Sequence, residues 1–280
     1  MQATRLYQSL MCPRCASAPA LGLSTCPGCG RSIAARGGGL DLLDDDARVA
    51  ADRFGAQYTA LRRREGWIGP DGREDPEAGE PRLWRGRLES AARAAAVLAG
   101  QGARVGRPVV ADIGSGGGWA IRYLSGADVI AIDLLDDQGR PDVLQVRGDM
   151  RHLPLRDGAV DAALYIASLH YAPAGAVIRE AARVLRPGGL VIAVDSPMYR
   201  DGRAQALARS RSSAYYAEAG FPELAEHYHP IDAAALPRTV AGAGFEILQL
   251  EPGRTGMRWW DSLRHPRRSS ILVAKLISRA

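Results

Sequence analysis

The chain has 280 residues, 46% of them hydrophobic and 24% charged, and its formal net charge is +5. This composition is typical of a globular protein and excludes the disordered and fibrous classes. No stretch approaches the roughly 18 to 20 apolar residues of a membrane helix, and the N-terminus has no apolar run long enough for a signal peptide. We therefore expect a soluble, cytoplasmic protein without a membrane partner.

Arginine carries almost all of the positive charge, because Lys275 is the only lysine among 36 basic residues. With abundant alanine and glycine, this skew is typical of a GC-rich genome. Net charge bears on nucleic-acid binding in general, but here it is weak evidence for a nucleic-acid partner. The excess is concentrated near the C-terminus, where residues 252–280 hold six arginines and Lys275 against Asp261.

All four cysteines lie near the N-terminus, with the spacing C-x2-C-x10-C-x2-C: Cys12, Cys15, Cys26 and Cys29. Two such pairs can converge tetrahedrally on Zn²⁺. Disulfides are the alternative, although a cytoplasmic location argues against them. Four thiolates leave no position for a catalytic water, so we predict a structural zinc ribbon over residues 1–45. A role in recognising substrate or partner is compatible with this interpretation.

Residues 46–82 are predicted to be a helix and a linker that cover the functional site. An amphipathic helix is expected over 47–66, followed by a loop rich in glycine, proline and glutamate. Tyr58 and Trp67 are candidates for closing over a bound cofactor. An alanine-rich helix is expected over 83–100.

From residue 109 onward, apolar strands alternate with helical patterns at about 117–125, 174–186 and 232–243. A turn at Pro187–Gly189 is expected before the fifth strand. The alternation predicts an α/β fold, a mostly parallel sheet with helices on both faces. The connection after the second strand is too short for a regular helix. The seven predicted strands are 109–113, 128–133, 142–146, 161–167, 190–195, 245–250 and 271–277.

A glycine-rich turn follows the first of these strands and contains Asp112, Gly114, Ser115, Gly116 and Gly118. Glycines at such a position allow a sharp turn from strand to helix and the close approach of a ligand. The dinucleotide fingerprint G-x-G-x-x-G and the phosphate-loop pattern G-K-[ST] are both incomplete here. Glycines alone are weak evidence for any one kind of ligand, so the residues that follow in the chain have to indicate which kind of site this is.

Four further landmarks follow in order along the chain. Asp133 ends the second strand, where an acid typically holds ribose hydroxyls. Gly148-Asp149-Met150 follows the third strand, Leu-Pro lies just beyond, and R-V-L-R-P-G-G precedes the fifth. With this pattern, residues 83–280 resemble class I S-adenosylmethionine-dependent methyltransferases, in particular the group called methyltransferase type 11. The short second connection departs from the family pattern, which usually has a helix there.

The resemblance implies a Rossmann-like, seven-stranded, mostly parallel sheet and S-adenosylmethionine as cofactor. It places the turn glycines beside the methionine and ribose, and Asp133 on the ribose hydroxyls. Asp149 and Met150 would flank the adenine, although Asp149 could also be a simple turn residue. The predicted cofactor residues are therefore Asp112, Gly114, Ser115, Gly116, Gly118, Asp133, Asp149 and Met150.

Residues 9–43 resemble a short zinc-ribbon module that partners tRNA methyltransferases and also occurs fused in front of bacterial methyltransferases. Ribosomal-RNA guanine methyltransferases likewise carry an N-terminal zinc site before this fold. This resemblance keeps an RNA acceptor open.

His170 and Tyr171 follow the fourth strand, at the edge that faces the ligand in such sheets. We predict that His170 acts as a base or contacts the acceptor, with Tyr171 beside it; a packing role for His170 is the alternative. Residues 196–231 form an insertion after the fifth strand. It is expected to be an acceptor-binding lid or a helical cover whose aromatics fill its own core. The insertion contains Tyr199, Tyr215, Tyr216, His227, Tyr228 and His229.

A small molecule is the acceptor we favour, because of the aromatic lid. The N-P-P-[YF]-type loop with which many amino methyltransferases bind a flipped base is also absent. An RNA methyltransferase using the zinc ribbon and the C-terminal segment is the alternative, and a non-catalytic cofactor-binding protein is a third possibility. The C-terminal segment combines arginines with tryptophans, a composition suited to stacking and phosphate contact, or to a solvated loop. Its key residues are Arg254, Arg258, Trp259, Trp260, Arg264, Arg267 and Arg268.

Overall fold

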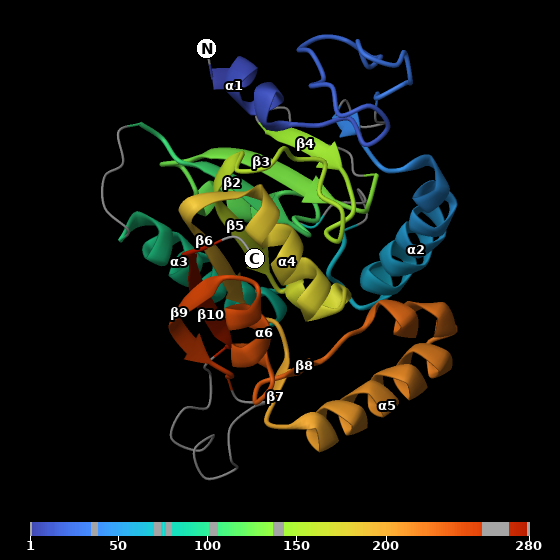
Figure 1. Ribbon diagram of the computed structural model, residues 1–280. Helices are drawn as coiled ribbons and strands as arrows, with labels where there is room; N and C mark the ends of the chain where they lie inside the picture. Colours follow the sequence, from blue (N-terminus) through green and yellow to red (C-terminus); the bar gives the residue numbers. More distant parts are fainter. Residues whose placement is uncertain are drawn as a thin grey trace.

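A large central sheet organises the chain (Figure 1). The computed structural model describes residues 2–34, 39–69, 74, 76, 80–100, 106–136, 143–253 and 269–278. Among these residues, no helix is both long and apolar enough to cross a bilayer. The Arg/Trp segment predicted near the C-terminus, residues 254–268, lies outside the described residues.

The sheet has eight strands in the order β1-β4-β3-β2-β5-β6-β10-β9. β10 runs antiparallel to both β6 and β9, and the remaining pairs are parallel. The predicted α/β class and its mostly parallel sheet are confirmed. The strands are β1 (Leu40–Asp41), β2 (Val109–Ile113), β3 (Asp128–Asp133), β4 (Leu144–Arg147), β5 (Val160–Ile166), β6 (Leu185–Val194), β9 (Phe245–Glu251) and β10 (Ile271–Leu276).

Helices cover both faces of the sheet because neighbouring residues of each strand point to opposite sides. Ala111 and Ile113 face a core shared with α1, α4 and α6, whereas Val110 faces α3. A third set, α2, α5 and η3, packs together beside the sheet. The helices are α1 (Gln2–Ser9), α2 (Asp45–Arg64), α3 (Pro81–Ala99), α4 (Ala174–Val184), α5 (Gly202–Glu218) and α6 (Leu236–Gly242), and the 3₁₀ helices are η1 (Trp119–Tyr123), η2 (Leu169–Tyr171) and η3 (Pro222–His227).

Several predicted elements differ from those observed. The helix expected over 117–125 is the short 3₁₀ helix η1, which begins after Gly118 in the left-handed conformation. The turn expected at Pro187–Gly189 is part of β6, which starts at Leu185 and pairs irregularly with β5. The helix expected over 232–243 begins at Leu236, because the residues before it form β8 (Ile231–Asp232), which pairs with β7 (Met198–Tyr199). The large sheet has one strand more than the seven predicted, and that strand is β1.

The N-terminal residues pack against the sheet rather than standing apart from it. Leu40 and Asp41 of β1 pair in parallel with β4. The Met11 amide donates to Pro154 O at 2.9 Å, and the Arg156 amide donates to Ser9 O at 2.9 Å. Two of the four cysteines are buried in the same apolar cluster as the sheet. The four-cysteine module, defined as residues 2–34 and 39–43, therefore shares a core with the rest of the chain.

Candidate functional site

The four cysteines lie close together in two matching turns. Their Sγ atoms are all within 4.8 Å of one another, with Cys12 and Cys29 3.9 Å apart and Cys15 and Cys26 3.5 Å apart. A tetrahedron of thiolates about 2.3 Å from a zinc ion has edges of about 3.8 Å. All four thiols are free, and the sulfur separations exceed the length of a disulfide bond. The donor set thus fits Zn²⁺.

Backbone hydrogen bonds shape both turns in the same way. In the first turn, the Ala16 amide donates to Cys12 O; in the second, the Gly30 amide donates to Cys26 O, each at 2.9 Å. The residue after each second cysteine has a positive φ, +59° at Ala16 and +70° at Gly30. The repeated turn aims two cysteine side chains at one point, which explains why the spacing alone predicted the cluster.

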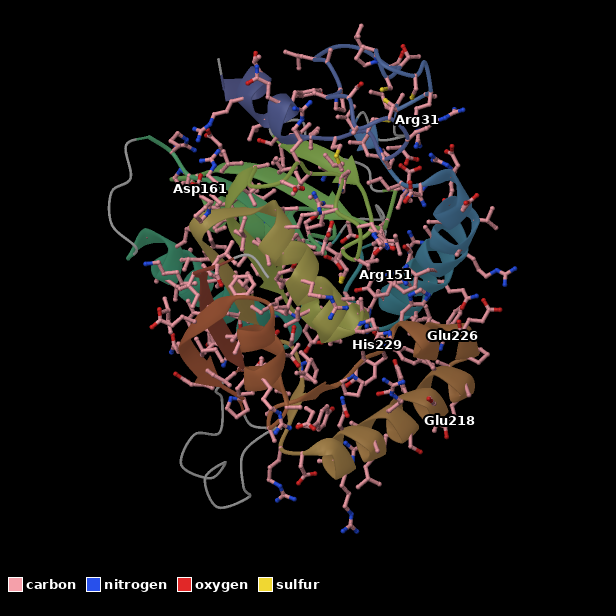
Figure 2. The ribbon with its side chains drawn as sticks, in the orientation of Figure 1. Arg31, Arg151, Asp161, Glu218, Glu226 and His229 are labelled. Atoms are coloured by element: carbon pink, nitrogen blue, oxygen red, sulfur yellow. The ribbon has the colours of Figure 1, made fainter. Side chains whose placement is uncertain are left out.

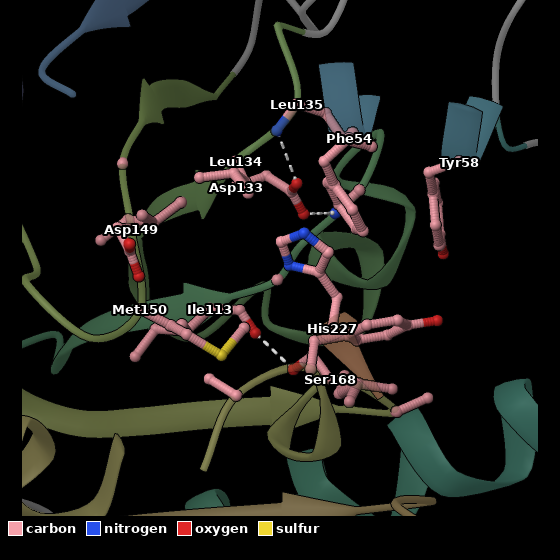
Figure 3. A pocket seen from close by; sticks show the side chains of 18 of the residues that line it. Phe54, Tyr58, Ile113, Asp133, Leu134, Leu135, Asp149, Met150, Ser168 and His227 are labelled. Atoms are coloured by element: carbon pink, nitrogen blue, oxygen red, sulfur yellow. Dashed lines mark hydrogen bonds between the residues drawn. The ribbon is translucent and has the colours of Figure 1, made fainter. Parts of the chain in front are cut away.

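A cavity opens at the carboxyl ends of β2, β3, β4 and β5, the edge at which α/β sheets bind ligands. Its empty volume is about 1150 Å³, open solvent included. We call it the main pocket (Figure 3). Gly114, Gly116, Asp133, Asp149 and Met150 from the predicted cofactor set line it. The other three residues predicted for the cofactor, Asp112, Ser115 and Gly118, do not line it.

Close contacts and positive φ angles both favour glycine in the turn. A Cβ atom at Gly114 would lie 2.4 Å from Ser168 Cβ, and one at Gly116 would lie 2.4 Å from Glu74 Oε2. Both glycines have positive φ, +70° and +52°. Ser115 is buried in the turn, and Gly118 has φ +68° just before η1; neither lines the main pocket. These two residues shape the turn, while Gly114 and Gly116 leave room along the pocket wall.

Asp133 sits where β3 ends and holds the glycine turn. Its Oδ2 accepts a hydrogen bond from the Gly116 amide at 2.7 Å, and its Oδ1 accepts one from the Leu135 amide at 2.9 Å. Figure 3 shows both bonds, with the carboxylate facing the pocket. The same side chain therefore organises two loops at the pocket wall.

Asp149 and Met150 follow β4, which pairs with β3, and Figure 3 shows them beside the Asp133 loop along the pocket wall. The Asp149 carboxylate accepts from the Arg151 side chain at 2.6 Å and from the Arg151 amide at 2.8 Å. Burial alone would raise the pKa of Asp149, but the hydrogen bonds from Arg151 keep it below its ordinary value. Asp149 therefore remains an anion, paired with Arg151.

Asp112 is 1% exposed and does not line the main pocket. Its Oδ2 is buried without a hydrogen-bond partner. Burial, assisted by the negative charge of Asp133, raises the pKa of Asp112 to about 7. It stands beneath the glycine turn as a buried acid that favours its protonated form.

This raised pKa predicts a pH-dependent loss of stability. Below about pH 4, Asp112 is protonated in both the folded and the unfolded chain. As pH rises toward 7, the unfolded chain releases this proton while the folded chain keeps it, so the free energy of unfolding falls by about 1.4 kcal/mol for each pH unit between the two pKa values. Urea unfolding at pH 4.5 and pH 8 should show this loss in the wild type and not in Asp112→Asn. The surface variant Asp157→Asn is the control, and equal pH slopes in all three would contradict the assignment.

Aromatic side chains from α2, η2 and η3 close the other side of the main pocket. The Phe54 ring lies 4.3 Å from the His227 ring, and Tyr58 lies 5.8 Å from Tyr171 in an edge-on arrangement. Arg62 supports them, since it donates to Tyr171 Oη at 2.9 Å and lies over the Tyr58 ring. We call Phe54, Tyr58, Tyr171 and His227 the aromatic roof. Tyr58, which was predicted to close over a bound cofactor, lines the pocket as part of this roof.

The three histidines near the pocket have different surroundings. His227 and His229 line it, and Figure 3 shows His227 projecting toward the side on which Asp133 lies. His170 lies behind the wall, 7% exposed, with its Nδ1 unpartnered, and its carbonyl accepts from the His229 amide at 2.7 Å. Burial, with the nearby positive charges of Arg87 and Arg62, lowers the pKa of His170 to about 3. Burial also lowers the pKa values of His227 and His229, so all three are neutral near pH 7.

Residues 196–231 contain β7, α5, η3 and the first residue of β8. Their aromatic side chains have two different roles. Tyr216 is buried against Leu61 of α2, and Tyr199 Oη lies 3.2 Å from Tyr228 Oη. These tyrosines fill the core of the insertion, while the histidines face the pocket. Figure 2 shows His229 and Glu226 on the side of the insertion nearest the sheet, and Glu218 farther out.

Two pocket residues were not anticipated from the sequence. Arg87 of α3 pairs with Asp195 at 3.1 Å and lies over Trp67, which packs against Trp84 rather than lining the pocket. Glu74 lies against Gly116. Neither belongs to a recognisable motif, and both reach the pocket from segments far from the glycine turn in sequence.

Comparison with known proteins agrees with this geometry. Residues 111–193 match a family model described as a methyltransferase domain. An uncharacterized methyltransferase of Mycobacterium tuberculosis is 35% identical over 88 residues, which cover 29% of this chain and 36% of that protein. A demethylmenaquinone methyltransferase of Beutenbergia cavernae is 34% identical over 126 residues, covering 42% of this chain and 48% of that protein. The chain thus spans less than half the length of either relative.

Two solved structures share the fold across most of the chain. One is from the complex between the Haloferax volcanii Trm112 methyltransferase activator and a putative methyltransferase. It has a TM-score of 0.52 and 18% identity, and covers 80% of this chain and 98% of that one. The other is a putative sarcosine dimethylglycine methyltransferase from Galdieria sulphuraria, with a TM-score of 0.51 and 15% identity, covering 83% and 98%.

The match places a methyltransferase domain over residues 111–193, which include the glycine turn and the strands β3, β4 and β5. The four-cysteine module adds β1 to the edge of this sheet, beside β4.

Proposed function

We propose that this protein transfers a methyl group from S-adenosylmethionine to a small-molecule acceptor. The observation that carries the proposal is the main pocket itself, in which the glycine turn, Asp133 and Asp149 face an aromatic roof supplied by α2, η2 and η3. Its lining combines aromatic and apolar side chains with a few polar groups, which is typical of small-molecule sites.

The residues of the sheet edge fit the cofactor. Gly114 and Gly116 leave the wall free of side chains, and Asp133 is an anionic acceptor for hydroxyl donors. Met150 and Asp149 offer an apolar face beside a polar one for a heterocycle. The bound cofactor supplies an electrophilic methyl group on a sulfonium, whose departure leaves a neutral thioether. Catalysis then depends mainly on holding the acceptor in line with that methyl group.

The aromatic roof supports a planar or apolar acceptor of limited size. Phe54, Tyr58 and Tyr171 present ring faces and edges, which bind apolar and π-rich groups well. The demethylmenaquinone named for the Beutenbergia relative is a small-molecule acceptor of this general kind. RNA remains the alternative, and it is one of the outcomes in the experiment below.

An acceptor that carries a proton needs a base, and we propose His227 for this task. His227 lines the pocket as a neutral imidazole, which can take a proton from a hydroxyl or an ammonium group. His170 contacts the ring of Tyr171 at 4.4 Å and fixes the His229 backbone, so we assign it the positioning of those two residues. Tyr171, which the sequence analysis placed beside His170, lines the pocket, and we propose that it contacts the acceptor.

His227→Ala is expected to reduce turnover about 10²- to 10⁴-fold with little change in cofactor affinity. His170→Ala should cost less than His227→Ala. Because burial lowers the pKa of His227 below 6.5, wild-type turnover should persist to a pH below that value. Single-turnover rates measured against pH test both statements. A large loss for His170→Ala with normal turnover for His227→Ala would return the role of base to His170.

The acceptor class can be found with methyl-labelled cofactor. The protein is incubated with it and with a cell extract separated into small-molecule, RNA and protein fractions. Label in the small-molecule fraction is the expected result, and Tyr58→Ala should abolish it. Label confined to RNA would overturn the small-molecule assignment. Cofactor binding without any labelled product would favour a non-catalytic binding protein.

We also propose that the four cysteines hold a structural Zn²⁺. The support is the tetrahedral-sized cluster of free thiols and the two matching turns. Four ligands complete the coordination of zinc, so the ion would stabilise the module and take no part in methyl transfer. The reduced thiols that such a site requires also suit the cytoplasmic location predicted from the sequence.

A further inference from the structure

Arg147 is a buried arginine that joins three separate parts of the chain. It ends β4, just before the Gly148-Asp149-Met150 segment, and its side chain is 4% exposed. A buried arginine has to be fully paired, because its desolvated charge is otherwise costly. Its partners therefore show what the residue holds together.

Each nitrogen of the Arg147 guanidinium has its own partner. Nε donates to the carbonyl oxygen of Leu134 at 3.0 Å, Nη2 pairs with Asp52 of α2, and Nη1 lies 3.5 Å from Asp41 of β1. The Leu42 amide also donates to Arg147 O at 2.9 Å. The planar guanidinium sets these directions at once, which a lysine ammonium would not do.

The first two partners, Leu134 and Asp52, belong to segments that border the side of the main pocket where the cofactor is proposed to bind. Leu134 and Leu135 follow Asp133 directly and line the pocket. α2 packs against this loop so closely that a Cβ at Gly55 would lie 3.3 Å from Leu135 Cδ2, and the next residue back, Phe54, belongs to the aromatic roof. Arg147 thus sets the distance between the Asp133 loop and the roof without touching the pocket itself.

The third partner belongs to the four-cysteine module. The Asp41 amide donates to Ile33 O at 2.8 Å, and Asp41 Oδ1 accepts from the Leu43 amide at 3.2 Å. Arg31, two residues after Cys29, donates to Leu43 O at 2.8 Å. A short path of hydrogen bonds, completed by the ion pair between Asp41 and Arg147, therefore leads from the second cysteine turn to Arg147.

We infer that Arg147 is a positioning residue for the cofactor, through which the four-cysteine module helps to set the affinity of the cofactor pocket. This inference rests on the proposed function, since it requires that the main pocket bind S-adenosylmethionine. The module then contributes to the affinity for the cofactor as well as to the stability of the fold.

The test uses the full chain and S-adenosylhomocysteine as the probe, with affinity measured by calorimetry. Arg147→Met is expected to weaken binding at least tenfold, and Asp52→Asn and Asp41→Asn several-fold each. Once Arg147 is methionine, Asp52→Asn should add no further loss. KM for the acceptor should change less than the affinity for the probe, because Arg147 contacts the Asp133 loop directly and reaches the aromatic roof only through Asp52 and α2.

A matched control separates this role from general stability. Arg186 of β6 forms a part-buried ion pair with Asp161 at 3.0 Å at the opposite edge of the sheet, and Figure 2 shows Asp161 far from Arg151. Arg186→Met should lower the melting temperature and leave probe affinity unchanged. An Arg147→Met chain that loses stability in the same way but binds the probe within twofold of wild type would overturn the inference.

Two further measurements keep the test decisive. If Arg147→Met does not fold, Asp52→Asn decides, because Asp52 is 56% exposed and its loss should leave the fold intact. Hydrogen exchange at the Leu135 amide should also accelerate in this variant, and unchanged exchange with unchanged affinity contradicts the inference. Failure of the wild-type chain to bind the probe at all would instead refute the proposed function.

Discussion

Cys26→Ser is expected to lower the thermal stability of the whole chain in one cooperative transition, rather than to unfold the N-terminal residues alone. Cys26 is 1% exposed, and it shares an apolar cluster with Leu10, Leu153 and Leu155. A structural zinc contributes about 10 kcal/mol or more to the folding of small domains. Losing one ligand should therefore remove several kcal/mol from a core that the module and the sheet have in common.

Scanning calorimetry measures the effect, and a decrease in melting temperature of about 10 °C or more is expected, at about 2 to 4 °C per kcal/mol for a chain of this size. A strong chelator should act like the substitution. Leu21→Ser is the matched control, because Leu21 lies in the same module and is 58% exposed. Two separate transitions, with the main one unchanged, would show that the module folds independently. A native mass without zinc would remove the metal assignment.

Asp133→Ala is expected to weaken cofactor binding at least tenfold, which corresponds to about 1.4 kcal/mol. The substitution removes the proposed partner of the ribose hydroxyls. It also removes the acceptor for the Gly116 and Leu135 amides, so the two loops beside the cofactor lose their common anchor. Both consequences act on the same ligand, and the loss should fall on affinity for S-adenosylhomocysteine rather than on acceptor KM.

Asp133→Asn refines this result, because an amide keeps one acceptor oxygen and should give an intermediate affinity. Asp157→Asn is the control at the opposite edge of the sheet, where the Asp157 side chain is 65% exposed and pairs with Arg183. Calorimetric titration of the three variants measures the order. Affinity within twofold of wild type for Asp133→Ala would remove Asp133 from the cofactor site.

Features set by nearby residues were predicted well from the sequence. The two C-x2-C pairs predicted the cysteine cluster, because each pair closes its own short turn. The glycine turn and Asp133 were predicted from their positions after two apolar strands, since parallel strands bring their carboxyl ends to one edge of a sheet. The short second connection was also noted, and its described residues Leu134 and Leu135 line the pocket directly.

Features set by packing between distant segments were not predicted. Nothing in the run around residue 40 indicates that it pairs with β4, because two residues carry no periodic signal. Arg147 has the appearance of an ordinary charged strand end, and its partners Asp41 and Asp52 come from two other elements. A charged residue directly after a predicted strand was the one available signal.

The histidines show the same limit at the site itself. The sequence placed His170 at the ligand edge, and the chain does pass there, but the 3₁₀ helix η2 puts Tyr171 on the pocket wall and His170 behind it. His227, 57 residues later, reaches the pocket because η3 packs beside α2.

The sequence by itself determined the cluster of four cysteines, the class of sheet, and the glycine turn together with Asp133. Each of these depends on residues close together along the chain or on the regular geometry of parallel strands. The tertiary structure decided which side chains close the pocket and how the cysteine module is joined to it. Those outcomes depend on which faces of α2, η3 and β1 meet the sheet, and burial of apolar surface between segments more than a hundred residues apart selects those faces.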